Sequence, residues 1–69
     1  MNAHQIDFLK AVYKKVSAQT EVACVWHLLF PTDDYTMKQL VRMGYLALSD
    51  VQDNVYLTVA GKSALGGRL

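Results

Sequence analysis

Residues 40–65 carry the clearest fold signal in the chain, with the sequence LVRMGYLALSDVQDNVYLTVAGKSAL. Up to Gly44 the apolar residues recur at helical spacing, whereas after it they follow the period of two that is typical of strands. Glycine adopts a positive φ without steric cost, so Gly44 suits the left-handed position that ends a helix. The stretch therefore predicts a helix that turns directly into a β-hairpin.

The predicted hairpin has two short strands, residues 45–48 and 55–58, on either side of a polar loop. The loop, residues 49–54, is rich in residues that favour turns. Thr58 can then cap a last helical turn that reaches Leu65, because its hydroxyl can accept a hydrogen bond from a free backbone amide.

A first helix is predicted over residues 3–18. Asn2 is a favourable N-cap, and Gln5, three residues later, gives the opening the pattern of a capping box. Apolar side chains then recur at helical spacing, at Ile6, Leu9, Val12 and Val16.

A helix over residues 34–43 is predicted from the same kind of pattern. Its inward face consists of Met37, Leu40 and Val41. Residues 32–34 offer three N-caps in a row, and Gly44 provides the end of the helix.

Residues 21–30 form the most apolar part of the chain and leave two interpretations open. The β-branched and aromatic side chains permit a strand. A helix is favoured because Pro31 provides a stop and because the apolar residues share one helical face. Those residues are Val22, Val25, Trp26 and Leu29.

Two segments, LVRMGYL at residues 40–46 and YLTVAGKSAL at residues 56–65, resemble a known family. They are similar to the end of the recognition helix and to the wing of MarR-type and related bacterial and phage regulators. Those regulators typically read Leu, two or three residues, Gly, Leu or Tyr, and Ile or Leu, with Leu-Thr-Pro-x-Gly after a variable loop. Val59 stands where that family often has proline, and the earlier part of the chain agrees only in the order of its elements.

The resemblance implies a winged helix-turn-helix domain. We therefore expect a mostly α fold with a small β-hairpin: a three-helix core, a wing and a short C-terminal helical turn. It would occupy residues 1–69 as a single domain, since a chain of this length has room for one core. This fold also serves in protein interaction, so it does not by itself determine a function.

In that family the exposed face of the third helix enters the major groove of duplex DNA. The candidate DNA-binding residues carried over by position are Tyr35, Thr36, Lys38, Gln39, Arg42 and, beside the wing, Lys62. Gln39 suits adenine, and Arg42 or Lys38 suits guanine or phosphate. The expected function is DNA binding by a small transcriptional regulator, acting as a homodimer because a lone domain makes few contacts.

Charge favours a different partner. The net charge is only +1, from seven Lys and Arg against six Asp and Glu, whereas DNA-binding domains usually show a clear basic excess. The predicted wing carries Asp50 and Asp53 and no basic residue. Any amphipathic helix at a protein surface exposes polar residues such as Lys38, Gln39 and Arg42. This face alone therefore does not decide for DNA binding.

The alternative is therefore a protein-interaction module, such as a phage or mobile-element inhibitor of a host complex (an anti-CRISPR protein is one example). Aromatic residues and methionine are enriched at protein interfaces. The candidate contact residues are Met43, Val51 and Tyr56.

Other chemistry is not indicated. Cys24, His4 and His27 do not make a metal set, because a structural zinc site usually needs four ligands. No phosphate-binding glycine loop or catalytic motif is visible, so we expect no enzyme, no metal and no cofactor. The chain also lacks a signal peptide and a membrane-spanning apolar stretch, which favours a soluble, cytoplasmic protein.

Overall fold

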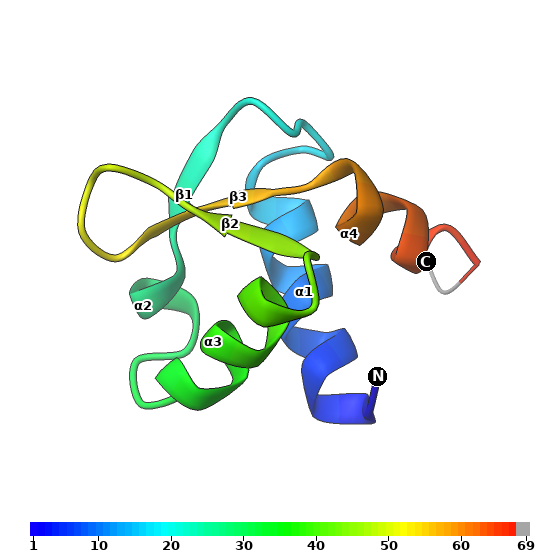
Figure 1. Cartoon of the computed structure of the whole chain (residues 1–69), viewed down its shortest axis with the longest axis horizontal. Coiled ribbons are helices and arrows are strands. Elements are labelled where there is room, and N and C mark those ends of the chain that lie inside the picture. Colours follow the sequence, from blue (N-terminus) through cyan, green and yellow to red (C-terminus); the bar gives the residue numbers. More distant parts are fainter. Residues whose placement is uncertain (68–69) are drawn as a thin grey trace.

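The computed structural model describes residues 1–67 (Figure 1). Along this part of the chain the elements are α1 (Ala3–Lys15), β1 (Ala23–Val25), α2 (Trp26–Leu29), α3 (Asp34–Arg42), β2 (Leu46–Leu48), β3 (Asn54–Leu57) and α4 (Val59–Leu65). About half of the residues are helical, and the strands form one antiparallel sheet. The protein is therefore a small α/β domain rather than a mostly α one. Within residues 1–67, no helix is both long enough and apolar enough to cross a membrane.

The sheet has the order β1-β3-β2, so the last strand in the sequence is the central one. Tyr56 on β3 lies opposite Ala23 on β1 and Ala47 on β2. Val55 and Leu57 alternate with it and are fully buried. One face of the sheet therefore covers the core, and the other carries Tyr56 between two alanines.

The core lies between the inner face of the sheet and the helices. Its largest fully buried side chains come from α1, α3, α4 and the two strands of the hairpin: Phe8, Leu9, Val12, Leu40, Leu46, Val55, Leu57 and Leu65. Each such side chain stabilises the fold by about 1.5–3 kcal/mol relative to an exposed one. Phe8 also stacks on Phe30 at 4.7 Å between ring centroids, which joins α1 to the segment before α3.

The capping box of α1 is confirmed. The amide of Gln5 donates to Asn2 Oδ1 at 2.8 Å, and the amide of Asn2 donates to Gln5 Oε1 at 3.0 Å. The helix ends at Lys15, three residues earlier than predicted, because Ser17 and Ala18 adopt φ of 53° and 64°. The amide of Ala18 donates to the carbonyl of Tyr13, which is the Schellman ending without its usual glycine.

The helix favoured for residues 21–30 is wrong in its first half. Ala23–Val25 forms a strand that pairs with β3, and only Trp26–Leu29 is helical. The amide of Trp26 donates to the carbonyl of Asp53 at 3.2 Å, so the change from strand to helix is fixed against the β2–β3 loop. Within α2, Trp26 is buried in the core whereas Leu28 is 73% exposed. Strand pairing, a contact between distant segments, decided between the two interpretations.

The predictions for residues 40–65 are confirmed at the level of secondary structure. Gly44 has φ 84°, and Thr58 caps α4 by accepting from the amide of Gly61 at 3.0 Å. The Thr58 hydroxyl also donates to the carbonyl of Gly44 at 2.6 Å. A Cβ on Gly61 would lie 2.2 Å from the carbonyl oxygen of Tyr45, so only glycine lets α4 approach β2 this closely. The end of α3, the hairpin and α4 are thereby joined into one unit.

Candidate nucleic-acid interface

The exposed face of α3 is anchored by a buried opposite face. Met37 and Leu40 point into the core, with Leu40 fully buried. Tyr35, Lys38 and Arg42 are exposed, and their spacing of three and four residues places them on one side of the helix. Tyr35 is 70% exposed, which is high for an aromatic side chain. This side of α3 can meet a large partner without any rearrangement of the core.

Thr36 does not belong to that face. It is only 3% exposed and lies one turn before Leu40, on the buried side of the helix. Its backbone amide donates to Asp33 Oδ1 at 3.2 Å in the N-cap of α3. Thr36 therefore does not share the exposed face that was expected to read DNA, because it lies on the same side of α3 as the buried Met37 and Leu40.

Gln39 is half-buried and already has two partners. Its Oε1 accepts from Gln5 Nε2 at 3.0 Å, and its Nε2 donates to the Tyr35 hydroxyl at 3.1 Å. The first of these bonds connects α1 to α3. Reading an adenine would require Gln39 to give up both bonds, so its main role in this structure is to brace the two helices.

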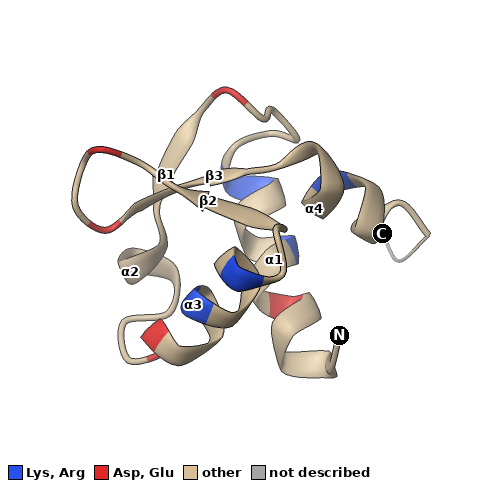
Figure 2. Cartoon of the chain, in the orientation of Figure 1, with Lys and Arg blue, Asp and Glu red and all other residues tan. Residues whose placement is uncertain are grey.

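Lys38 and Arg42 are the cations of the α3 face (Figure 2). Lys38 Nζ lies 3.3 Å from Asp34 Oδ2, and both side chains are largely exposed. Exposed ion pairs of this spacing stabilise by only about 0.3–0.5 kcal/mol, so a phosphate can replace Asp34 at little cost. Arg42 forms no ion pair within residues 1–67 and is free to make a bidentate contact.

The N-terminus of α3 is occupied by a carboxylate. Asp33 caps the helix and also contacts His4 Nε2 of α1. Burial acts to raise the pKa of Asp33, but the hydrogen bonds from Thr36 and His4 together outweigh it and hold the pKa below its ordinary value. An ionised Asp33 takes the place that a phosphate would occupy at a helix N-terminus.

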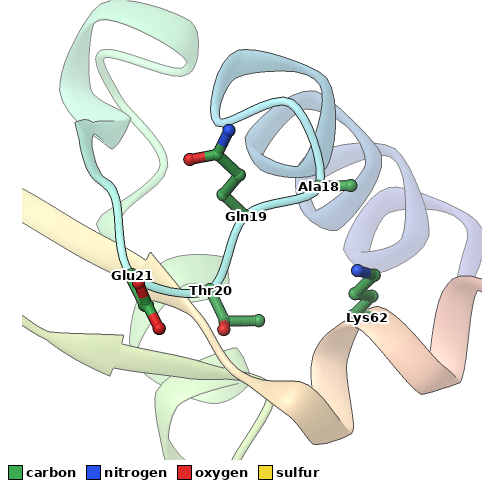
Figure 3. A pocket seen from close by; sticks show the side chains of 5 residues that line it. All are labelled: Ala18, Gln19, Thr20, Glu21 and Lys62. Carbon is green, nitrogen blue, oxygen red and sulfur yellow. The ribbon is translucent and has the colours of Figure 1, made fainter.

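Lys62 lies on a different side of the protein from the one expected. It lines an open pocket of about 320 Å³ together with Ala18, Gln19, Thr20 and Glu21 (Figure 3). These four residues follow the end of α1, and they are not part of α3. The described cations therefore form two sets: Lys38 and Arg42 on α3, and Lys10, Lys14, Lys15 and Lys62 on α1 and α4.

The β2–β3 loop is acidic and partly apolar. Asp50 and Asp53 are exposed there, and Val51 between them is 61% exposed (Figure 2). Of the other two candidates for a protein contact, Met43 is 42% exposed and Tyr56 is half-buried in the centre of the sheet. The sequence reasoning missed Val59, which is 73% exposed. Val59 is the first residue of α4, and nothing in the sequence pattern indicated that it faces outward.

Residues 1–67 contain no group of three His, Cys, Asp or Glu side chains that could hold a metal ion. Cys24 is buried on the inner face of the sheet, where burial raises the pKa of its thiol and the charge of Lys15 acts weakly in the opposite direction. Cys24 belongs to the hydrophobic core.

No known protein family, no curated protein and no solved structure matches this chain. Its function therefore has to be inferred from its own residues and their geometry.

Proposed function

We propose that the chain is a winged helix-turn-helix domain that binds duplex DNA through α3 and acts as a small transcriptional regulator. The element order supports the fold: α2 and α3 are consecutive helices, and β2 and β3 form a hairpin directly after them. The order β1-β3-β2 adds a short strand before α2 to that hairpin, which gives the three-stranded sheet beside the helices. In this arrangement α3 is the recognition helix and the hairpin is the wing.

The observation that carries the DNA proposal is the face of α3. Tyr35, Lys38 and Arg42 point to solvent from a helix whose other side is locked into the core. Arg42 can make a bidentate contact to guanine, and Lys38 can contact guanine or a phosphate. Tyr35 can donate its hydroxyl to a phosphate oxygen.

The proposed contact is small. Two cations on α3 would release about two counterions, so affinity should fall about tenfold between about 50 and about 200 mM salt. A second copy on an adjacent half-site would double the contacts. We therefore expect weak binding by one copy and a steep gain when two copies share a site.

The test is fluorescence anisotropy of a labelled duplex of mixed sequence, titrated with the protein at low and moderate salt. Arg42→Ala and Lys38→Ala should each weaken binding about three- to tenfold and should each lower the salt dependence by about one counterion. Lys10→Ala on α1 is the matched control, because it removes the same charge away from α3. Equal losses for all three variants would show that α3 is not the binding face.

The second candidate is a protein-interaction module, favoured by the exposed Val51 between Asp50 and Asp53. A wing of this charge repels phosphate and suits a basic protein surface. The same titration separates the two functions. A folded protein that shows no DNA binding at low salt, where the phosphate contribution is strongest, would exclude the DNA proposal and favour a host protein as the partner.

A further inference from the structure

Two separate parts of the surface differ in charge: one is acidic, and the other carries Lys62 and Glu21 with Lys14 and Lys15 nearby. The hairpin tip consists of Asp50, Val51 and Asp53. The α1–α4 pocket is the open cavity of about 320 Å³ lined by Ala18, Gln19, Thr20, Glu21 and Lys62, with the 73% exposed Val59 one turn before Lys62 on the same helix. We propose that the hairpin tip of one copy docks into the α1–α4 pocket of a second copy.

The pocket has room for the tip, and three lysines lie on its wall or next to it. Its volume of about 320 Å³ leaves room for the side chain of Val51. Lys62 forms one wall (Figure 3), and Lys14 and Lys15 lie in the last turn of α1 just before the pocket. Within residues 1–67, neither Lys62 nor the two carboxylates of the tip form an ion pair. Docking would pair these groups without breaking an existing bridge.

The tip cannot reach the pocket of its own chain, so the proposed contact would join two copies. Figure 1 shows the β2–β3 loop and α4 at opposite ends of the longest dimension of the molecule, which is 30 Å. A contact between two different surfaces is heterologous, so each copy would keep one free tip and one free pocket. Association should therefore continue beyond a dimer as the concentration rises.

Glu21 limits the strength of this contact. Its carboxylate lies on the pocket wall, where it repels the carboxylates of an incoming tip. The docked area is also smaller than a standard interface, so association should become visible only above about 100 μM. Glu21→Gln should therefore strengthen association, by about two- to fivefold.

The test is sedimentation velocity over a range of concentrations at low salt, without DNA. The result is thus independent of the proposed DNA binding. Asp50→Lys and Lys62→Glu should each weaken association at least about tenfold, because each places like charges in contact. The Asp50→Lys/Lys62→Glu double variant should restore it, since the reversed tip then meets a reversed pocket. Asp7→Lys on α1 is the matched control for a charge reversal and should leave association unchanged.

Three results would overturn the proposal. The first is a protein that stays monomeric at low salt up to about 1 mM, where even a contact of about −4 kcal/mol would be seen. The second is association that neither single variant weakens. The third is a double variant that remains monomeric although circular dichroism shows it to be folded.

Discussion

α3 and the β2–β3 hairpin follow one another in the chain, yet they present opposite charge to solvent. α3 exposes Lys38 and Arg42 beside Tyr35, whereas the hairpin exposes Asp50 and Asp53 beside Val51. The two are held together by Thr58, which donates to the carbonyl of Gly44 and caps α4. The buried side of this segment thus determines one shape, and its exposed side offers two different surfaces.

This difference bears on the proposed binding of DNA. If α3 enters the major groove, a wing that follows it is brought towards the phosphates, where two carboxylates are unfavourable. The positive charge on α3 suits contact with phosphates, whereas the negative charge of the hairpin tip does not. We infer that α3 is the DNA contact and that the hairpin tip is available for the second copy.

The largest expected effect comes from breaking the junction that holds the two regions in place. Gly61→Ala would put a Cβ 2.2 Å from the backbone oxygen of Tyr45, which cannot move aside as a side chain could. We expect a loss of about 3 kcal/mol, at the upper end of the range for overpacking. Urea unfolding followed by circular dichroism measures it. Gly67→Ala, where nothing lies within 4 Å of the added Cβ, is the matched control, and an equal effect of both would contradict the close approach of α4.

The sequence predicted the elements that depend on residues close together in the chain, and it failed where the structure depends on contacts between distant segments. The end of α3, the hairpin and α4 were predictable because local rules act there: Gly44 needs a positive φ, and Thr58 caps the next helix. Residues 23–25 were not, because their strand exists only through pairing with β3, about 30 residues further along the chain. Local preference left both a helix and a strand open for these residues.

The candidate site followed the same division. The spacing of Tyr35, Lys38 and Arg42 predicted a shared exposed face, since one helix fixes their relative positions. Lys62 could not be placed, because its neighbours at the end of α1 are distant in the sequence. The bond from Gln5 to Gln39 was also beyond reach, as it joins two helices whose packing the pattern does not specify.

A smaller effect should show how close the wing comes to DNA. The Asp50→Asn/Asp53→Asn double variant removes the negative charge of the hairpin tip. Asparagine tolerates the φ of 64° that Asp53 adopts. If the wing lies beside the phosphates, affinity at low salt should rise about fivefold, as expected for two screened surface charges. Anisotropy with the same duplex measures it. Unchanged affinity would mean that the hairpin stays away from DNA and that α3 binds alone.

The smallest expected effect comes from Asp33. Its carboxylate caps α3, whereas the carboxylates of the hairpin tip are exposed in a loop. Because the pKa of Asp33 in the folded protein lies below its ordinary value of 3.8, the ionised group stabilises the fold above that value. This contribution is lost as the pH falls through the lowered pKa.

Asp33→Asn keeps a cap but removes the charge, so we expect it to cost about 0.5 kcal/mol at neutral pH and the difference to vanish in acid. Urea unfolding at a series of pH values measures this. Asp50→Asn in the exposed loop removes the same charge away from the helix end, and if both variants behaved alike, Asp33 would not be the charge that the helix end depends on.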